Sequence, residues 1–378
     1  MKWIGRSVGA LAWVLCGLSS AQAEVILSAD EVAQTLRHGP WPPEVTLDPS
    51  NRVSGDANAI AFGEALFSDP ILSQDRTMSC ASCHDPERDF TDRLARAEGR
   101  KTLDRNTQAL WNLAGQRWFG WSGDSDSLWA QNLTPLLNPD ELGHDAQSMQ
   151  SALLASPHRP AYEALFGEMD AEPALETTVN VAKLLAAYIE TLRSGKTSFD
   201  HFRDALEIGD MQMAAQYPEP AQRGLQIFLG QGNCTFCHSG PAFTNGEFHD
   251  AAVPYFLEQG GVDPGRAEGI DRLAESPFTL DGAFSDDPSK AGAWAVRNVR
   301  FQHGNFGIFR VPTLRRAAHT APYMHDGSLP DLAAVVQHYN HIDMERLHSD
   351  GEAILRPLGL SDQEAEDLEA FLKTLSDD

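Results

Sequence analysis

The segment MSCASCHDPERDF, residues 78–90, is the most informative part of this chain, because it places two cysteines two residues apart with a histidine directly after them, at Cys80, Cys83 and His84. The same arrangement returns in GNCTFCHSGPAF, residues 232–243, as Cys234, Cys237 and His238. Two thiols at this spacing can add to the two vinyl groups of a haem, and the adjacent histidine can then bind the iron. The repeat therefore predicts two covalently bound c-type haems, with His84 and His238 as iron ligands.

Paired cysteines also occur in redox disulfides and in four-cysteine zinc sites. Neither use requires a histidine directly after both pairs. Of the five cysteines in the chain, Cys16 alone lies outside the two motifs. A zinc-binding structural protein is therefore the weakest alternative to a dihaem protein.

The first 23 residues, MKWIGRSVGALAWVLCGLSSAQA, have the pattern of a secretory signal peptide. Lys2 and Arg6 precede an apolar run, and the small residues Ala21 and Ala23 predict cleavage before Glu24. The apolar run is shorter than the ~20 residues of a membrane-spanning helix. We therefore expect a periplasmic protein with no membrane anchor after signal cleavage.

The chain is strongly acidic. Its formal charge is −25 at pH 7, and removal of Lys2 and Arg6 with the signal peptide makes it −25 − 2 = −27. Such a charge argues against nucleic acid and against an anionic membrane as partners. It would suit a protein partner with a basic face.

The repetition extends upstream of the cysteines. Gly63–Phe67 and Gly224–Phe228 share the pattern Gly-x-x-Leu/Ile-Phe, which predicts a short helix before each motif. We infer two related haem domains, residues 24–210 and 211–378. Apolar residues at helical spacing in 180–195 and 361–375, the latter opened by a capping box at Ser361 and Glu364, predict a mainly α fold.

Residues 247–305 are rich in glycine, proline and aspartate, and they predict a long irregular excursion from the second domain.

Three further blocks are RNTQALWN (105–112), FGWSGDSDSLWAQNLTPLLNPDELG (119–143) and FRVPTLRRAAHTAPYMHDGS (309–328). With the two haem motifs, they make the chain from Val53 onward resemble the bacterial dihaem cytochrome c peroxidase and MauG superfamily. The resemblance implies two cytochrome c-like domains packed together, with a calcium ion between them. It also implies reduction of hydrogen peroxide at the N-terminal haem, with the C-terminal haem relaying electrons.

The resemblance also implies roles for individual residues. His84 would be the proximal ligand of the peroxide-reacting haem, and the residues lining its open face would be Gln131, Pro135 and Glu141. Cleavage of bound peroxide needs a proton moved between its two oxygens, so Glu141 is the predicted acid/base. Trp121 matches the tryptophan between the haems, and the calcium position is matched by Asn106, Thr320 and Pro322.

Two departures from the cytochrome c peroxidases of this superfamily separate the chain from them. Those enzymes carry a second histidine that blocks the peroxide haem, whereas residues 85–143 here contain no histidine and the next one is His144. We therefore expect a five-coordinate first iron that binds peroxide without prior reduction.

The second departure concerns the other iron. A methionine normally ligates it, and counting forward from His325 places Tyr339 at that position. A phenolate favours ferric iron, whereas a thioether favours ferrous iron. Rival ligands are Met344, His338 and His341.

Both departures favour a MauG-like enzyme, which would store oxidising equivalents in a high-valent dihaem state. The resemblance implies that it would use them to oxidise an aromatic residue, by preference a tryptophan, of a periplasmic partner protein. Electrons would pass from the partner to the relay haem and across Trp121. MauG has a surface tryptophan just before its second haem motif, where Gly232 stands here. Trp118 and Trp129 make the block at 117–131 more similar to the MbnH-type branch, which modifies a tryptophan of a copper-associated partner.

Two alternatives remain. One is a peroxidase that removes hydrogen peroxide with electrons from a small redox protein, and the other is a dihaem electron carrier without catalysis.

Overall fold

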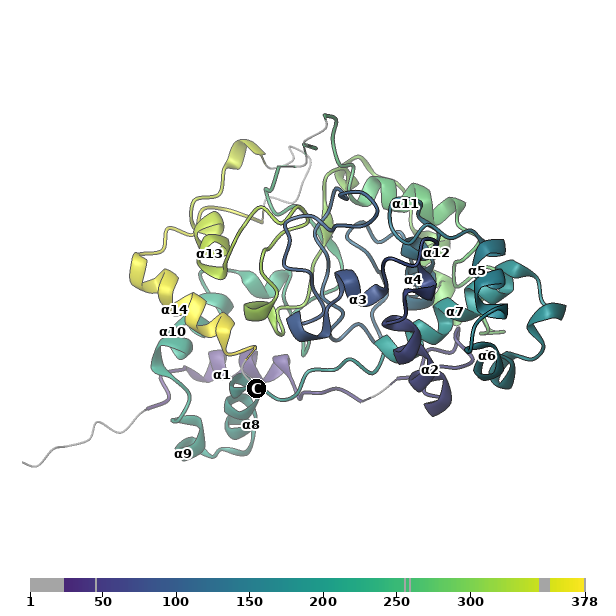
Figure 1. Cartoon of the computed structure of the whole chain (residues 1–378). Helices are drawn as coiled ribbons and strands as arrows, with labels where there is room; N and C mark the ends of the chain where they lie inside the picture. The colour runs from purple at the N-terminus through teal and green to yellow at the C-terminus, as the bar shows by residue number, and fades with distance from the viewer. Residues whose placement is uncertain (1–23, 45, 255, 258–259, 347–353, 377–378) are drawn as a thin grey trace, which may run out of the picture.

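The computed structural model describes residues 24–44, 46–254, 256–257, 260–346 and 354–376. The predicted signal peptide lies outside these residues. The described chain is mainly helical, which confirms the predicted fold class (Figure 1). Its one sheet in the described residues has two antiparallel strands, β1 (Phe248–His249) and β2 (Phe309–Arg310). Among the described residues, no helix is both long and apolar enough to cross a membrane.

The first hydrophobic core, from Val53 to Leu192, forms around α7. This helix is buried over most of its length and packs against α2, α4 and α5. The helices of this half are α2 (Ala57–Phe67), α3 (Cys80–Cys83), α4 (Leu128–Leu137), α5 (Ala146–Leu154), α6 (Arg159–Phe166) and α7 (Ala174–Ile189).

The second core, from Phe199 to Leu375, forms where α10 packs against α14. Figure 1 shows this group on the opposite side of the molecule from α2 and α4–α7. Its helices are α8 (Ser198–Ile208), α9 (Met211–Ala214), α10 (Glu219–Leu229), α13 (Leu332–Asn340) and α14 (Asp362–Lys373). The predicted capping box at the start of α14 is confirmed.

The repeated glycines explain how each core closes. A Cβ placed on Gly63 in α2 would lie 2.1 Å from the carbonyl oxygen of Leu184 in α7. A Cβ placed on Gly224 in α10 would lie 1.9 Å from the carbonyl oxygen of Asp367 in α14. In both halves, glycine therefore lets the helix before the haem motif pack directly against the backbone of the neighbouring helix, α7 or α14. The two predicted short helices are confirmed as α2 and α10.

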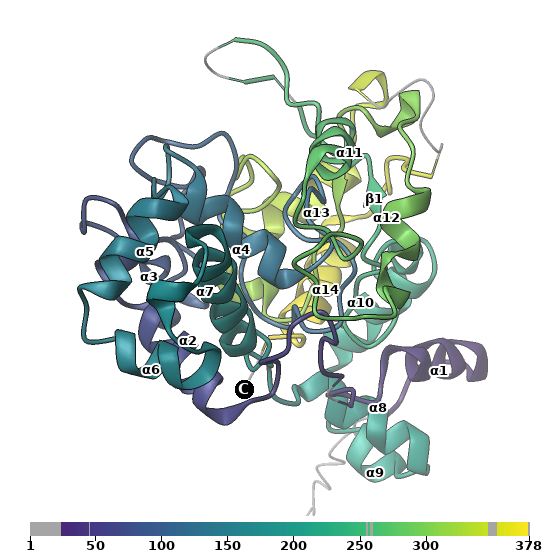
Figure 2. The ribbon, with the colours of Figure 1, turned by 90° about the vertical axis from the view of Figure 1, so that its right-hand side faces the viewer.

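The two cores change over between Leu192 and Phe199, earlier than the predicted domain boundary. Helix α8 lies in the second core. The N-terminal helix α1 (Ala29–Thr35) also packs against α10 (Figure 2). The division into residues 24–210 and 211–378 stays a prediction. It would place α1 and α8 in the N-terminal domain, although both helices pack with the second core.

The excursion is mostly irregular, but it contains α11 (Arg266–Glu275) and α12 (Trp294–Asn298). It reaches back to the first core, where Phe278 and Phe284 pack. The buried ammonium group of Lys183 in α7 lies 2.7 Å from the carboxylate of Asp286. Short 3-10 helices connect the main elements: Leu36–His38, Pro70–Leu72, Pro86–Arg88, Met169–Ala171, Cys234–Phe236, Ala291–Ala293, His303–Asn305, Ala317–His319 and Met344–Arg346.

Candidate haem sites

The first motif opens into a cavity. Helix α3 carries both cysteines, and His84 follows at its end. About 600 Å³ of empty space, part of it open to solvent, is bounded by Cys80, Cys83 and His84 together with Pro135 and Glu141. Most other lining residues are apolar: Phe67, Met78, Leu110, Leu136, Leu142, Leu185 and Ile189. An apolar cavity with two thiols and an imidazole in its wall fits a covalently attached haem.

The imidazole of His84 is held by the backbone. Its Nδ1 lies 3.2 Å from the carbonyl oxygen of Phe90, so this nitrogen carries the proton. Burial lowers the pKa of His84, which favours the neutral ring. The remaining nitrogen, Nε2, is therefore available as an iron ligand, with the other ring nitrogen fixed by a hydrogen bond, as is usual for metal-binding histidines.

None of the four described cysteines forms a disulfide. Burial raises the pKa of Cys80 to about 12 and that of Cys83 to about 11. Cys80 packs against the first core and Cys234 against the second. The placement of the two cysteine pairs in separate cores argues against a zinc site shared by all four cysteines.

The wall of the cavity also contains the predicted acid/base. The carboxylate of Glu141 accepts a hydrogen bond of 2.8 Å from the side-chain amide of Asn138. Burial raises the pKa of Glu141, and the negative charges of Asp124 and Asp140 raise it further. A carboxyl group with a raised pKa holds its proton to a higher pH than an ordinary glutamate, which suits a group that takes up and releases a proton.

Helix α4 positions the other two residues predicted for the open face. Pro135 lines the cavity. Gln131, one turn earlier, is not among the lining residues, and its buried side-chain oxygen has no hydrogen-bond partner. The catalytic roles of both residues stay predictions.

His144, the first histidine after His84 in the sequence, forms hydrogen bonds away from the cavity. Its Nε2 lies 3.1 Å from the carbonyl oxygen of Ile71, and its Nδ1 lies 3.0 Å from the hydroxyl of Ser148. Both ring nitrogens therefore have partners, and His144 does not line the cavity.

The second motif repeats the geometry of the first. A 3-10 helix, Cys234–Phe236, leads to Cys237 and His238. The Nδ1 atom of His238 lies 3.0 Å from the carbonyl oxygen of Phe243, and burial lowers the pKa of His238 to about 4. Burial raises the pKa of Cys234 to about 12. This histidine is also neutral, with Nε2 available.

Tyr339, on α13, lies beside this second motif. Its pKa is raised by burial and by the nearby thiols of Cys234 and Cys237. The rival ligands lie differently. Met344 is 48% exposed, His341 is exposed, and the Nε2 of His338 lies 2.8 Å from the carbonyl oxygen of Ala251.

The predicted bridge between the sites lies in a hydrogen-bonded junction of both halves. The indole nitrogen of Trp121 donates to the carbonyl of Asn106 at 2.8 Å, and the amide of Arg310 donates to the carbonyl of Trp121 at 2.8 Å. The amide of Asn106 donates to the carbonyl of His325 at 2.7 Å. The junction therefore joins residues 106–121 to the segment 310–325.

The three residues of the predicted calcium position make the following contacts. The side-chain amide of Asn106 donates to the carbonyl of Leu94 at 2.8 Å. The hydroxyl of Thr320 donates to the carbonyl of Ala317 within its own turn, and a cis peptide bond precedes Pro322. Calcium binding by these residues stays a prediction.

Comparisons with known proteins agree with this geometry. A family model described as di-haem cytochrome c peroxidase matches residues 57–207. The methylamine utilization protein MauG of Methylorubrum extorquens is 33% identical over 319 residues, which cover 84% of this chain and 77% of the relative. The chain belongs to the dihaem cytochrome c peroxidase and MauG family. A cytochrome-c peroxidase, IdrP2 of Denitromonas iodatirespirans, is 30% identical over 85% of this chain and 83% of its own length.

Solved structures support the same assignment. A MauG-like protein associated with microbial copper homeostasis superposes with a TM-score of 0.66 at 26% identity, covering 90% of this chain and 96% of that protein. The diheme peroxidase BthA of Burkholderia thailandensis has the same fold, with a TM-score of 0.68, 22% identity, and coverage of 88% and 89%.

Membership in the dihaem cytochrome c peroxidase and MauG family makes this chain a haem peroxidase that uses hydrogen peroxide and carries two c-type haems. The sequence motifs do not indicate several buried or half-buried residues that hold the loops after the two histidines, some directly and others through Arg315. They are His38, Trp41, Asp89, Asp200, Arg315 and Arg316. Both arginines lie in the block 309–328, but their partners are far away in the sequence and no local pattern indicates them.

Proposed function

We propose that this protein is an exported, periplasmic dihaem enzyme of the MauG-like type. Hydrogen peroxide would react at the haem attached to Cys80 and Cys83, and the oxidising equivalents would be used on an aromatic residue, by preference a tryptophan, of a partner protein. The second haem would be attached to Cys234 and Cys237. When bound, the two haems supply the redox chemistry, and the residues of this chain position them and move protons.

The observation that carries the proposal is the place of Tyr339. It is a half-buried phenol next to the second pair of cysteines, whereas the side chain of the rival Met344 is 48% exposed. A tyrosine ligand stabilises ferric iron and makes the second haem a poor acceptor of electrons from a small cytochrome. This choice of ligand suits an enzyme that stores oxidising equivalents better than one that consumes electrons continuously.

The open side of the first cavity supports direct reaction with peroxide. Both ring nitrogens of His144 have hydrogen-bond partners, and among the described residues His84 is the one histidine that lines the cavity. Glu141 would accept the proton from one peroxide oxygen and return it to the other. Its hydrogen bond to Asn138 fixes the carboxylate in the wall.

Trp121 supports transfer between the two sites. Its indole nitrogen is tied to the carbonyl of Asn106, and its own carbonyl is tied to Arg310. A rigid aromatic side chain in the junction would serve as a stepping point for electrons. We also propose calcium at Asn106, Thr320 and Pro322, which would fix the same junction.

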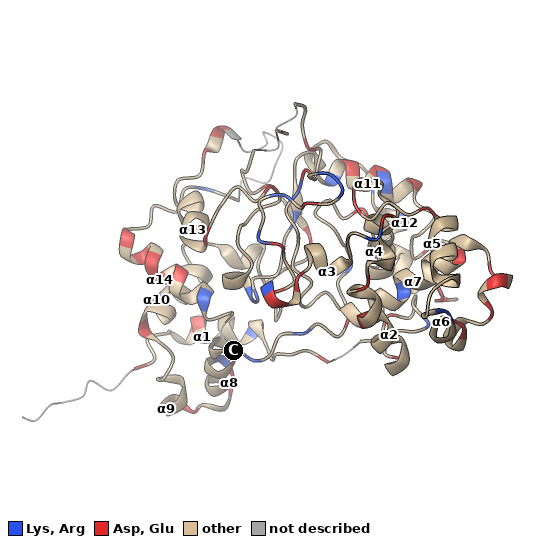
Figure 3. Ribbon diagram, in the orientation of Figure 1, with Lys and Arg blue, Asp and Glu red and all other residues tan. Residues whose placement is uncertain are grey.

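Two relatives help to choose the type of partner. MauG and the MauG-like protein associated with copper homeostasis are both similar to this chain over most of its length. The second of these supports a partner protein associated with copper, as the resemblance to the MbnH-type branch implies. The net negative charge of this chain, with several of its acidic residues on α14 (Figure 3), would suit a basic docking face on that partner.

The alternative is a peroxidase that removes hydrogen peroxide with electrons from a small redox protein. Its support is the similarity to IdrP2 of Pseudomonas sp., which is 30% identical over 100% of this chain and 95% of the relative. This function would require a second iron that is easily reduced, and therefore a ligand other than Tyr339.

The first experiment adds one equivalent of hydrogen peroxide to the diferric protein as isolated and records its visible and near-infrared spectrum. An immediate change in the haem bands, with a near-infrared band from charge shared between the haems, is expected. A spectrum that changes only after prior reduction would contradict the proposal and favour the alternative peroxidase. The Met344→Leu variant serves as a control, because this residue is not expected to touch either site.

A further inference from the structure

Two adjacent arginines contact the loops that follow the two motif histidines. The Nε atom of Arg315 donates to the carbonyl of Pro241 at 2.6 Å, in the loop between His238 and Phe243. The Nε atom of Arg316 donates to the carboxylate of Asp89 at 2.6 Å, directly before Phe90. The carbonyls of Phe243 and Phe90 are the ones that hold the Nδ1 atoms of the two histidines.

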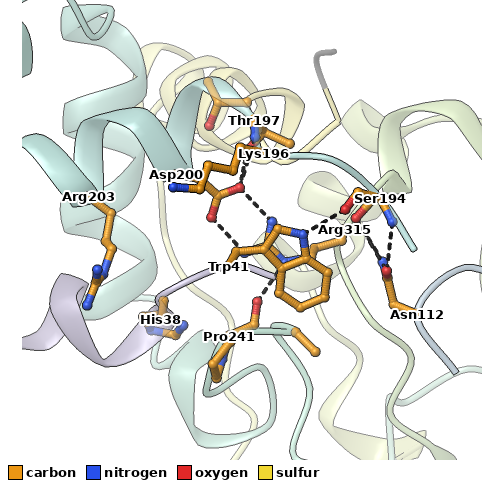
Figure 4. Close-up of polar contacts among 12 residues, drawn as sticks. His38, Trp41, Asn112, Ser194, Lys196, Thr197, Asp200, Arg203, Pro241 and Arg315 are labelled. Carbon is orange, nitrogen blue, oxygen red and sulfur yellow. Dashed lines mark hydrogen bonds and ion pairs between the residues drawn. The ribbon is translucent and has the colours of Figure 1, made fainter. Parts of the chain in front are cut away.

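Arg315 is fully buried and fixed from several sides (Figure 4). It forms a two-pronged ion pair with Asp200 at 2.8 and 2.9 Å, and its guanidinium lies 3.8 Å from the ring centre of Trp41. Next to it, the Nδ1 of His38 lies 3.2 Å from the carbonyl oxygen of Gly240, and the His38 ring stacks on Phe243 at 4.5 Å. The N-terminal segment and α8 therefore hold the loop after His238 through these contacts.

Arg316 makes the corresponding contacts in the other half. Its ion pair with Asp89 is mostly buried, and its guanidinium lies 4.9 Å from the ring centre of Trp111. Trp111 packs edge-on against Phe90, with ring centres 5.2 Å apart. The backbone amide of Arg316 donates to the carbonyl of Leu375 at 3.0 Å, which anchors the dipeptide to the end of the second core.

We propose that Arg315 and Arg316 are positioning residues for the two proximal histidines, one arginine for each haem. Each holds the loop whose carbonyl accepts the histidine's Nδ1 proton, and the peptide bond between them fixes the two loops relative to each other. This inference rests on the proposed haem attachment sites. A hydrogen bond donated by the Nδ1–H group makes a ligating imidazole more electron-donating, so the arginines would set the reduction potentials of the irons through the loops.

The test uses the variants Arg315→Lys and Arg316→Lys in the full dihaem protein. Lysine keeps the positive charge but cannot reproduce the planar fork that holds a carboxylate and a second acceptor together. Both potentials are measured by spectroelectrochemical titration, and the haems are assigned with the Tyr339→Phe variant. Arg316→Lys is expected to raise the potential of the haem at His84 and leave the other unchanged. Arg315→Lys is expected to raise the potential of the haem at His238 and leave the potential of the haem at His84 unchanged.

Two further variants make the result decisive. Asp89→Asn is nearly isosteric and removes the charge that Arg316 binds, so it is expected to have the same effect as Arg316→Lys. Asp89→Asn and Arg316→Lys together decide the test even if Arg315→Lys does not fold. Arg223→Lys is the matched control, because Arg223 forms a similar ion pair with Asp367 at 2.6 Å between α10 and α14. It should lower the unfolding temperature without moving either potential.

Several outcomes would overturn the inference. One is a lower unfolding temperature with both potentials unchanged, which means a structural role only. Another is an equal shift of both haems by either arginine variant, which removes the assignment of one arginine to each haem. A wild-type protein with fewer than two covalent haems, measured as the pyridine haemochrome, would instead contradict the proposed attachment sites.

Discussion

The carboxylate of Glu141 accepts a hydrogen bond of 2.8 Å from the side-chain amide of Asn138, in the wall of the cavity that also contains His84. An amide donor holds the carboxylate in one orientation without neutralising it. Burial raises the pKa of the same group, so the site combines a fixed position with ready proton exchange. This pairing supports the proposed role of Glu141 in proton transfer.

Replacement of this carboxylate should therefore slow the reaction with peroxide. Glu141→Gln keeps the size and the contact with Asn138 but removes the proton acceptor. General acid–base catalysis contributes roughly 10²–10⁴-fold, and we expect a loss of this size in the second-order rate constant, measured by stopped-flow absorbance. Glu87→Gln, at an exposed carboxylate near the same motif, is the control and should leave the rate unchanged. An undiminished rate in Glu141→Gln would remove Glu141 from the mechanism.

The same residue predicts a pH dependence. Because burial raises the pKa of Glu141, the folded protein binds its proton more tightly than the unfolded chain does. Its contribution to stability is therefore present below the ordinary pKa and is lost as pH rises through the raised folded value. Catalysis has the opposite sign, because the ionised form accepts the proton. The rate should rise with pH, with a midpoint above the usual ~4.3 of a glutamate, and this rise should be absent in Glu141→Gln.

Much of the fold and of both haem sites could be predicted because the decisive signals are local. A motif of five residues specifies each attachment site, and Gly63 and Gly224 mark the helix before it. The contacts around the histidine loops could not be predicted in the same way. Trp41 and Arg315 lie far apart in the sequence, and only the folded structure brings them together. The early change of core after Leu192 likewise depends on packing between distant helices.

Close helix packing gives a stability prediction for each half. In Gly63→Ala, the new Cβ would lie 2.1 Å from the carbonyl oxygen of Leu184, so α2 and α7 must move apart. Overpacking of this kind typically costs about 1–3 kcal/mol in the free energy of unfolding, and thermal or denaturant unfolding should detect it. Gly224→Ala should have a similar effect through Asp367. Gly195→Ala is the matched control, because no atom lies within 4 Å of a Cβ there. Equal stability of all three variants would contradict the packing argument.

The ligand of the second iron separates the two candidate functions most directly. Tyr339 is half-buried beside Cys234 and Cys237, and replacing it with methionine would exchange a phenolate for a thioether. Axial ligands adjust haem potentials over a span of ~0.8 V, so a rise on the order of 0.1–0.3 V is expected for Tyr339→Met. The near-infrared band formed with peroxide should weaken or disappear, because the second haem would no longer be held in a ferric state that shares charge with the first.

The control for this exchange is Met344→Leu, at a side chain that is 48% exposed. If Tyr339 is the ligand, this variant should keep the wild-type potentials and electron paramagnetic resonance spectrum. If instead Met344→Leu shifts the second potential while Tyr339→Met does not, Met344 is the ligand in solution. The protein would then have the easily reduced second haem of a peroxidase fed by a small redox protein, and the MauG-like proposal would fail.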